Sequence, residues 1–494
     1  MNARGKREAT LDTTSFAGVA GLARSRAFLL AEGGLAAGER LRSGLSSSAP
    51  NGEGSPELPR TLPWALPRAI PRALLIGTVA SDLYLGYAAL RKKHERSPAQ
   101  PGPDASLDWD REHRRGAGRV RDAAGSLGGA LIKAGQFAST RPDLLPAAYI
   151  QTLSSLQDRV PPLPWPVVER TLARELGRGL KEVFAAVEPR PLASASLAQV
   201  HRARLRDGRA VALKIRYPHV AGLVEADLGA LRTVFGAISA LEPKIQLSPI
   251  ADYLEWTLPL ELDFLREAEA LRELKAALKD RDDVLIPDVI GEFSTERLLV
   301  MELMEGYKIT DREALVSAGI EPRAVAELLN DVYADQIYNH HYLHADPHPG
   351  NLLVQPGKNG PKLVLLDHGL TLPLEPELVG PLEKVVRALP EGDLETTTAA
   401  LKEAGLDVGN EDDLGALLQL VGVLFDSGDA AEADASDANA MDLGSFGENL
   451  GSGIGDIPPK LLLVGRAIGL LDGITRQLDP DLDALEIVGR YTNP

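Results

Sequence analysis

Apolar and polar residues follow two different periods along the chain, and the period changes near residue 181. From Trp109 to Leu180 apolar residues recur three and four positions apart, with a break at the proline-rich residues 161–166. This spacing predicts helices. Residues 181–218 instead hold two β-type runs, VHRARL and AVALKIRY, on either side of Asp207-Gly208. Such runs around an Asp-Gly pair predict a β-hairpin.

Helical spacing returns over residues 219–280 and again from Arg312 onward. Between these stretches, VLIPDVIGEF and RLLVMEL predict two more strands, and LLVQ and KLVLLD predict strands within the last helical region. No unit of 20–50 residues repeats, which argues against a solenoid. The pattern therefore predicts a small β-rich region between helical regions.

The segment from Ile70 to Leu90 is apolar enough to suggest a membrane helix. Eighteen residues separate Arg72 from Arg91, which suits a short span. Asp82 lies near the middle, where a carboxylate costs about 2.5–3.5 kcal/mol. We therefore expect a helix that lies on a membrane surface or packs on the protein, rather than one that crosses a bilayer.

Charge changes this picture at the N-terminal end. The 494 residues carry a net charge of -17, which argues against general nucleic-acid binding. Residues 1–120 nevertheless carry +6 and the remainder -23. A basic N-terminal arm suggests an anionic partner such as a membrane surface. The chain has no cysteine, which excludes disulfides, thiol nucleophiles and cysteine-ligated metal centres.

The segment from Tyr342 to Leu370 carries the clearest chemical pattern. Asn351 follows Asp346 by five residues, and a strand-like run then ends at Asp367-His368-Gly369. Kinases use this order because the first aspartate orients or deprotonates the attacking hydroxyl. The asparagine and the second aspartate offer hard oxygen ligands to the Mg²⁺ that bridges the nucleotide phosphates. The segment predicts an ATP- and Mg²⁺-dependent phosphoryl-transfer site.

Two further segments supply the remaining parts of such a site. The run AVALK places Lys214 on the second strand of the hairpin, where a kinase lysine holds the α- and β-phosphates. The turn that would cover the phosphates is Ala193-Ser194-Ala195-Ser196, instead of the glycine-rich turn of most kinases. Glu267, on a predicted helix, is the candidate partner of Lys214.

With the run Leu131-Ile132-Lys133-Ala134-Gly135-Gln136, these residues resemble the UbiB/AarF atypical kinase-like family, which is linked to ubiquinone and other prenyl-lipid metabolism. The run is similar to the K-x-G-Q signature of that family. The resemblance covers roughly residues 110–480. It implies a helical extension that carries Lys133, Gly135 and Gln136 and folds over the active site.

The resemblance also implies a role for each matching residue. Residues 193–196 correspond to the alanine-rich loop, Lys214 and Glu267 to the ion pair, and Glu261 and Asp263 to the E-x-D carboxylates. Asp346 corresponds to the catalytic aspartate, and Asn351 and Asp367 to the metal ligands. The MELMEG run, with Glu302 and Met304, corresponds to the hinge that contacts adenine. Ser194 departs from the alanine-rich pattern.

Simpler interpretations apply to several of these residues. Taken alone, Lys133, Glu261 and Asp263 would be ordinary solvated charges. The histidines at 340, 344 and 348 suggest a zinc site with Asp346, but that site would leave Asp367-His368-Gly369 unexplained. His344 is instead expected to brace its loop by hydrogen bonds to the backbone. The apolar segment Leu461–Leu471, which contains Arg466, is expected to be a core helix.

Together these observations predict an α+β, two-lobed protein-kinase-like fold with a helical N-terminal extension. The expected parts are a poorly ordered basic arm (1–60), an apolar and basic helix with a linker (61–108), the K-x-G-Q extension (109–185), an N-lobe (186–305) and a helical C-lobe (306–494).

The expected function is Mg-ATP binding with hydrolysis or phosphate transfer to a small molecule, in support of ubiquinone or isoprenoid-lipid metabolism. The expected location is the cytoplasm, with peripheral contact at the inner face of the membrane. The expected partners are a nucleotide and a prenyl-lipid or quinone-pathway molecule or enzyme. The alternative is a catalytically weak, nucleotide-gated scaffold. A small-molecule kinase of the aminoglycoside/choline type shares the aspartate pattern but lacks the K-x-G-Q extension.

Overall fold

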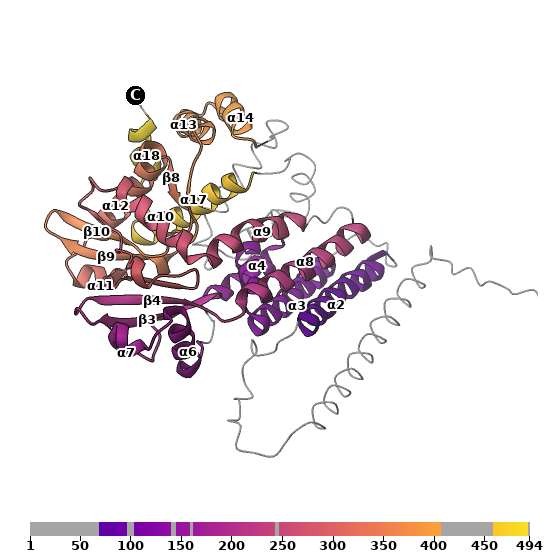
Figure 1. The fold of residues 1–494 in the computed structure, drawn as a ribbon. Coiled ribbons are helices and arrows are strands. Elements are labelled where there is room, and N and C mark those ends of the chain that lie inside the picture. The colour runs from indigo at the N-terminus through magenta and orange to yellow at the C-terminus, as the bar shows by residue number, and fades with distance from the viewer. Residues whose placement is uncertain are drawn as a thin grey trace, which may run out of the picture. The chain divides into compact units, whose positions relative to one another are not determined.

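A computed structural model describes residues 69–95, 103–139, 145–158, 162–242, 247–406 and 458–492. All described residues belong to one compact unit, Pro63–Pro494. The predicted basic arm, residues 1–60, lies outside the described residues. The predicted α+β, two-lobed kinase-like fold with a helical extension is confirmed (Figure 1).

The extension is a helical layer. It comprises α2 (Ala69–Glu95), α3 (Pro103–Leu127), α4 (Ala130–Ala138), α5 (Ala147–Ser154) and η2 (Ser155–Asp158). In Figure 1, α2 and α3 lie beside α8 (Val220–Leu241), and α2 packs against both. The predicted boundary between residues 108 and 109 falls inside α3.

A buried ion pair holds α2 on this layer. The guanidinium of Arg72 donates to both carboxylate oxygens of Asp227, at 2.8 and 2.5 Å, and to the carbonyl of Leu127 at 2.7 Å. Both charged side chains are almost fully buried. Among the described residues, α2 is the one helix whose length and composition would suit a membrane span. Its contact with α8 supports the expectation that this apolar segment packs on the protein.

A five-stranded antiparallel sheet forms the N-lobe. Its strands are β1 (Phe184–Val187), β3 (Ala198–Leu205), β4 (Ala210–Arg216) and β6 (Leu298–Glu302) in that order, with β2 (Ala193–Ser194) paired to β3. The predicted hairpin is β3 and β4, and Gly208 in its turn has a φ of 94° that favours glycine. The helices α6 (Trp165–Leu176) and α7 (Leu180–Val183) contact this sheet, α6 at β4 and α7 at β1.

Two helices connect the N-lobe to the rest of the unit. The chain passes from α9 (Ser248–Leu262) to α10 (Phe264–Ala277) through the single residue Asp263. The carboxylate of Asp263 accepts hydrogen bonds from the backbone N–H groups of Leu265 and Arg266, so it caps α10. This cap fixes the direction in which α10 leaves α9, and α10 carries Glu267.

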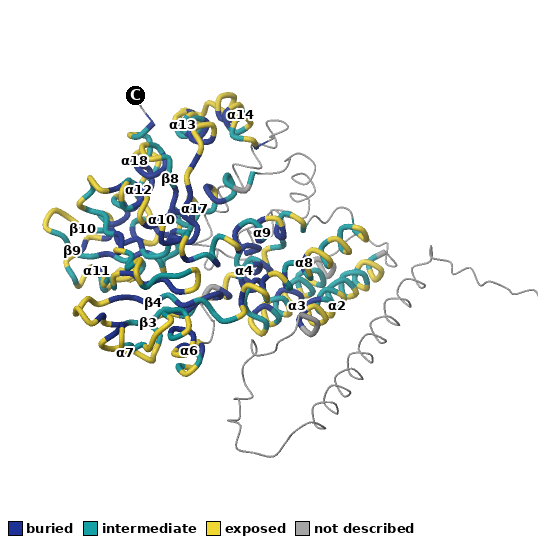
Figure 2. Tube along the Cα trace, in the orientation of Figure 1, coloured by how far each residue is buried: buried dark blue, intermediate teal, exposed yellow. Residues whose placement is uncertain are grey.

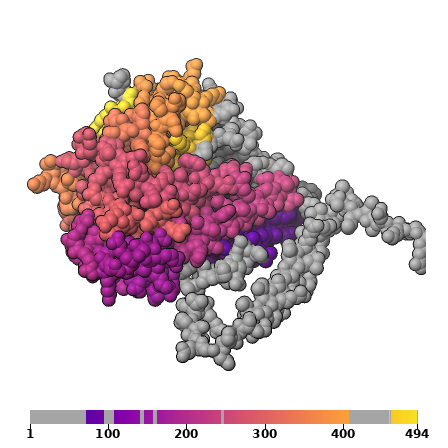
Figure 3. Space-filling view, in the orientation of Figure 1, coloured from indigo at the N-terminus to yellow at the C-terminus, as the bar shows by residue number. Residues whose placement is uncertain are grey.

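The C-lobe combines helices with short strands. The four-stranded sheet has the order β5 (Val284–Leu285), β10 (Gly360–Leu365), β9 (Leu352–Gly357) and β7 (Tyr307–Lys308), and β8 (Tyr342–His344) pairs with β11 (Thr371–Pro373). The helical elements are α11 (Arg312–Ser317), α12 (Pro322–Ala334), the π-helix η4 (Asp335–Asn339), η5 (Pro349–Asn351), α13 (Pro376–Glu391), α14 (Leu394–Glu403), α17 (Pro459–Leu478) and α18 (Ala484–Thr492). The short helix η3 (Gly291–Phe293) instead contacts β6 of the N-lobe sheet. In Figure 3 the purple surface of the N-lobe and the orange surface of α13 and α14 lie at opposite ends of the same face.

Two hydrophobic cores hold these parts together (Figure 2). One core lies between the N-lobe sheet and α6 and includes Leu172, Leu213 and Val300. The other is continuous from the extension to the C-lobe, from Phe137 on α4 to Leu463 on α17. The extension therefore shares its core with the C-lobe and forms part of the kinase-like body.

Candidate functional site

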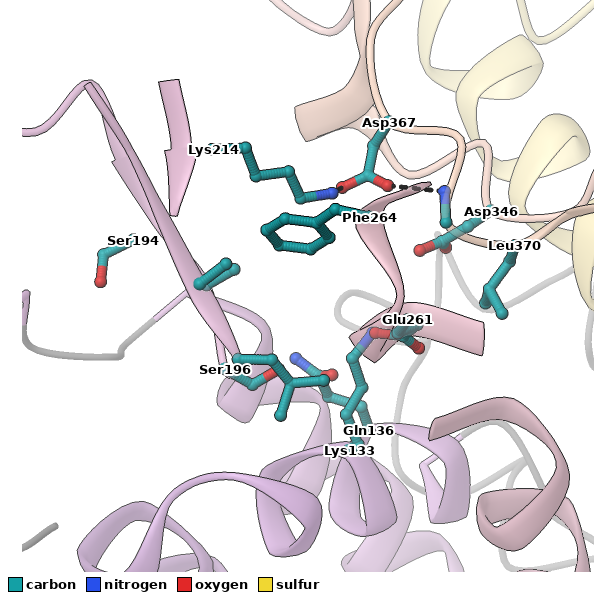
Figure 4. Close-up of a pocket in the computed structure, with 14 residues that line it drawn as sticks. Lys133, Gln136, Ser194, Ser196, Lys214, Glu261, Phe264, Asp346, Asp367 and Leu370 are labelled. Carbon is teal, nitrogen blue, oxygen red and sulfur yellow. Dashed lines mark hydrogen bonds and ion pairs between the residues drawn. The ribbon is translucent and has the colours of Figure 1, made fainter. Parts of the chain in front are cut away.

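A small cavity forms where the N-lobe, the extension and the C-lobe meet (Figure 4). Its volume is about 120 Å³. The predicted site residues that line it come from segments far apart in the sequence: Lys133, Gln136, Ser194, Ala195, Ser196, Lys214, Glu261, Asp346 and Asp367. Phe264, Gly369 and Leu370 also contribute to its wall. The fold thus brings most of the predicted site together.

Lys214 lies at the centre of the ion pairs in this cavity. Its ammonium contacts both carboxylate oxygens of Glu267, at 2.7 and 2.9 Å, and Oδ2 of Asp367 at 2.8 Å. The antiparallel pairing of β4 with β3 and β6 places Lys214 between Val200 and Leu299. The cap at Asp263 and the turn after β10 bring the two carboxylates to it. One lysine therefore joins the N-lobe sheet, α10 and the Asp367-His368-Gly369 turn.

Burial and charge act in opposite directions on these three groups. Burial raises the pKa of Glu267 to about 7, although the nearby ammonium of Lys214 opposes this shift. Burial also disfavours ionised Asp367, but the charge and hydrogen bond of Lys214 outweigh that effect and hold the pKa of Asp367 below its usual range. The two carboxylates outweigh burial at Lys214 and raise its pKa. Lys214 and Asp367 are therefore both charged at neutral pH.

Asp346 is held by a residue that the sequence did not point to. The Nη2 atom of Arg466, on α17, lies 2.7 Å from Oδ1 of Asp346. Burial raises the pKa of Asp346, but the charges of Arg466 and Lys133 overcome it and keep this pKa below its usual value. The side chain of Asn351 donates to the backbone carbonyl of Asp346 at 3.2 Å. The only signal for Arg466 in the sequence was a charge within the apolar run predicted to be a core helix.

The extension contributes directly to the cavity wall. The ammonium of Lys133 lies 2.7 Å from Oε2 of Glu261, so this ion pair joins α4 to α9. The side chain of Gln136 donates to the carbonyl of Leu156 at 3.3 Å. In Figure 4, Lys133, Gln136 and Ser196 approach the cavity from the side opposite Lys214 and Asp367. At Gly135, a Cβ would lie 2.4 Å from the side chain of Leu156, which explains a glycine here.

The first two residues of the alanine- and serine-containing loop form strand β2. Ala193 and Ser194 pair with β3, and the N–H of Ala195 donates to the carbonyl of Ala198 at 2.8 Å. The hydroxyl of Ser194 lies 2.8 Å from the hydroxyl of Tyr217. Ser194, Ala195 and Ser196 line the cavity, whereas Ala193 is not part of its wall. The departure at Ser194 thus adds a side-chain contact that an alanine would lack.

Five other predicted site residues are not part of the cavity wall: Asp263, Glu267, Glu302, Met304 and Asn351. Glu267 and Asn351 act through the contacts with Lys214 and Asp346 given above. Asp263 is the cap of α10 described above. Glu302 is exposed at the end of β6, where its carboxylate accepts from the N–H of Asp288 at 3.3 Å. Met304 follows β6 and is partly buried. Contacts of Glu302 and Met304 with adenine stay a prediction.

Two buried histidines, His344 and His368, brace the candidate site segments. His344 contacts the backbone carbonyl of Asp367 through Nε2 and the hydroxyl of Tyr333 through Nδ1. His368 contacts the carbonyl of Leu365 at 3.2 Å, and burial, assisted by His344, lowers the pKa of His368 to about 3. Within the described ranges, no three His, Cys, Asp or Glu side chains are arranged to hold a metal ion. His344 therefore has the bracing role expected for it, and a zinc site among the described residues finds no support.

The side-chain oxygens of Asp367 and Asn351 suit Mg²⁺ as a ligand set. Mg²⁺ in nucleotide sites takes one or two protein oxygen ligands and completes its shell with phosphates and water. Oδ1 of Asp367 accepts from the N–H of Gly369 at 3.1 Å, which fixes the carboxylate. The amide of Asn351 is oriented by its bond to Asp346. Asp367 and Asn351 are therefore the residues that would hold Mg²⁺.

Comparisons with known proteins identify a matching family. Residues 155–401 match the model of the ABC1 atypical kinase-like domain. AarF domain-containing protein kinase 1 of Xenopus tropicalis is 38% identical over 260 residues, which cover 52% of this chain and 50% of that protein. Protein ACTIVITY OF BC1 COMPLEX KINASE 8, chloroplastic, of Arabidopsis thaliana is 31% identical over 407 residues, 74% of this chain and 52% of that one. The chain thus matches about half the length of these curated relatives.

A solved structure is also similar. The Rv3197–erythromycin complex from Mycobacterium tuberculosis aligns with a TM-score of 0.50 and 25% identity, over 76% of this chain and 95% of that chain. The family match includes the alanine- and serine-containing loop, Lys214, Asp346 and Asp367. The chain therefore belongs to the UbiB/AarF family of ABC1 atypical kinase-like proteins.

Proposed function

We propose that this atypical kinase-like protein binds Mg-ATP and hydrolyses it, or transfers its terminal phosphate to a small molecule. The observation that carries the proposal is the position of Lys214, whose ammonium contacts Glu267 and Asp367 in a cavity that also contains Asp346. In phosphoryl-transfer sites, such a lysine holds the α- and β-phosphates and such an aspartate holds the metal.

Each residue of the site has its own proposed role. Lys214 holds the phosphates, and Glu267 fixes Lys214. Asp367 and Asn351 would hold Mg²⁺, which would neutralise charge that develops on the phosphate oxygens. Asp346 orients the attacking oxygen, whose bond to the γ-phosphorus forms as the bond to the bridging oxygen of ADP breaks. Because its pKa is held low, Asp346 acts by orientation, and the proton of the attacking group passes to the phosphate or to solvent.

The extension beside the cavity favours water or a small acceptor over a peptide. Lys133 and Gln136 of the extension form part of the cavity wall. A relative from Dictyostelium discoideum is named a probable serine/threonine-protein kinase. That activity is not proposed for this chain, because the extension lies where a peptide substrate would bind.

Other observations support a pathway and a location. The family resemblance supports a role in ubiquinone or isoprenoid-lipid metabolism, with a prenyl-lipid or quinone-pathway molecule or enzyme as partner. The basic N-terminal sequence and the exposed leucines of α2, Leu74, Leu75 and Leu85, support peripheral contact with an anionic membrane. We propose a cytoplasmic protein that contacts the inner face of the membrane.

One observation favours a second candidate function. The cavity is small and Lys214 is already occupied by two carboxylates. If the cavity widens enough to admit ATP but Lys214 stays paired with its two carboxylates, the protein would bind ATP and hydrolyse it slowly. The protein would then be a nucleotide-gated scaffold for lipid or protein partners.

Nucleotide binding is the first test of the proposal. Isothermal titration with ATP, with and without Mg²⁺, should show Mg²⁺-dependent binding by the wild type and loss of binding in Lys214→Met. Lys384→Met is a matched control, because Lys384 pairs with Glu403 on the exposed surface of the C-lobe. Equal affinity in the wild type and both variants would refute the role of Lys214. Binding that survives Asp346→Asn while turnover is lost would separate an enzyme from a scaffold.

A further inference from the structure

Behind the cavity wall, an unbroken chain of contacts leads from the extension to Asp346. The ring of Phe137 on α4 stacks on the ring of Tyr253 on α9, with centroids 3.6 Å apart and planes at 7°. The hydroxyl of Tyr253 accepts a hydrogen bond from Nη1 of Arg466 at 3.0 Å. The Nη2 atom of the same guanidinium donates to Oδ1 of Asp346 at 2.7 Å.

The Phe137–Tyr253 stack and the Lys133–Glu261 ion pair join the same faces of α4 and α9. Lys133 and Phe137 are four residues apart and so lie on one face of α4. Tyr253 and Glu261 are eight residues apart, about two turns along one face of α9. The same two faces therefore meet twice, at the Lys133–Glu261 ion pair in the cavity and at the Phe137–Tyr253 stack behind it.

Tyr253 is placed to orient Arg466 and has no direct access to a substrate. It is 5% exposed and is not part of the cavity wall. Burial raises its pKa, so the phenol stays neutral and accepts the hydrogen bond from Arg466. A guanidinium is planar with donors in a fixed fork, so a bond at Nη1 sets the direction of Nη2.

We propose that Tyr253 is a positioning residue for phosphoryl transfer, which fixes Asp346 through Arg466 and couples that fixation to the docking of the extension helix α4 through Phe137. The inference rests on the proposed function. It assigns to the extension an effect on the orientation of the catalytic aspartate, in addition to the wall it forms in the cavity.

The proposal predicts a specific split between kinetic constants. Tyr253→Phe removes one hydroxyl and keeps the ring stacked on Phe137. It should lower kcat for ATP turnover about tenfold, the scale of one hydrogen bond to a charged group. KM for ATP should stay within about twofold, because the phosphates contact Lys214. Tyr491→Phe is the matched control: its hydroxyl also bonds a charged group, Asp331, at 2.7 Å, and its kcat should equal that of the wild type.

A double-mutant cycle distinguishes positioning from general stability. Arg466→Lys keeps a positive charge near Asp346 but loses the fork. In that background Tyr253→Phe should have no further effect on kcat. A kcat unchanged in Tyr253→Phe, or an equal tenfold loss in both backgrounds, would overturn the proposal. Phe137→Leu, which keeps the phenol and removes the stack, should reproduce the kcat loss in part and provides the test if Tyr253→Phe does not fold.

Failure of the proposed function would be recognised separately. A wild type that turns over no ATP would remove the proposed function. The positioning claim would then be tested by crystal structures of the wild type and Tyr253→Phe. Separation of the Arg466 guanidinium from Asp346 in the variant would support the claim. A contact unchanged from the 2.7 Å found here would overturn it.

Discussion

The ammonium of Lys133 on α4 lies 2.7 Å from the carboxylate of Glu261 on α9, and both side chains line the cavity that contains Lys214 and Asp367. This pair makes the extension part of the candidate active site. It also sets the charge that a nucleotide would meet, because Glu261 partly neutralises a cation that could otherwise contact phosphate.

The two halves of this ion pair should therefore have opposite effects on ATP affinity. Glu261→Gln frees the charge of Lys133 and should tighten Mg-ATP binding about threefold, whereas Lys133→Met should weaken it about threefold, the scale of one partly exposed charge interaction. Isothermal titration measures both. Shifts in the same direction would contradict a phosphate-binding role for Lys133.

Lys214 should matter for stability as well as for binding. Its removal leaves Glu267, which is 1% exposed, without its cation, so Lys214→Met should reduce the free energy of unfolding by about 3 kcal/mol. Lys214→Met combined with Glu267→Gln should recover part of that loss, because the fully buried carboxylate is removed, whereas Asp367, whose side chain is 40% exposed, still loses its cation. The double variant should still fail to bind ATP. Urea unfolding and titration test both statements, and a double variant as unstable as the single one would contradict the charge argument.

The order of the motifs was sufficient to predict much of the fold and site. Lys214 follows from an apolar strand run in which a lysine needs a partner, and Asp346, Asn351 and Asp367 follow from their spacing. The hairpin of β3 and β4 follows from alternation around Asp207-Gly208. Each of these patterns lies within a short stretch of sequence. Which residues contact one another, such as Lys214 and Glu267, was implied by the family resemblance.

Arg466 and Tyr253 could not be predicted because their roles arise only in the tertiary structure. Arg466 lies 120 positions after Asp346 and Tyr253 lies 93 before it, in runs that indicate buried helices. For Asp263, the sequence predicted a role that differs from the contact seen in the structure. In the sequence it is one carboxylate of an E-x-D pair, whereas in the structure its Oδ1 atom caps α10. A sequence pattern does not distinguish these two uses of an aspartate.

The buried pair of Arg72 and Asp227 should anchor α2 to the kinase-like body. Asp227→Ala leaves a buried guanidinium without its partner and should lower the free energy of unfolding by about 3–5 kcal/mol. Arg72→Met with Asp227→Leu should be much closer to the wild type. Disruption of the exposed pair of Arg323 and Glu327 by Glu327→Ala is the control and should cost under about 1 kcal/mol. Equal losses in the two single variants would show that α2 does not depend on the buried pair.

His201 should contribute to acid sensitivity. It is fully buried between Gln199 and the carbonyl of Glu188, and burial lowers its pKa below the usual 6.5. The unfolded chain therefore binds a proton more readily, so stability from this residue is complete above about pH 6.5 and is lost as the pH falls below that value. His201→Gln keeps a donor and an acceptor without the titration. Its free energy of unfolding should fall less than that of the wild type between pH 7.5 and 5. A parallel fall would contradict a neutral buried His201.

The most direct test of the account is phosphate release from Mg-ATP, with and without anionic liposomes, by the wild type and Asp367→Asn. The account predicts turnover by the wild type that rises with liposomes and disappears in the variant, because Asp367 would hold the metal and contacts Lys214. Background release by both proteins, together with a melting temperature that ATP still raises, would contradict the enzymatic proposal and leave a nucleotide-binding scaffold.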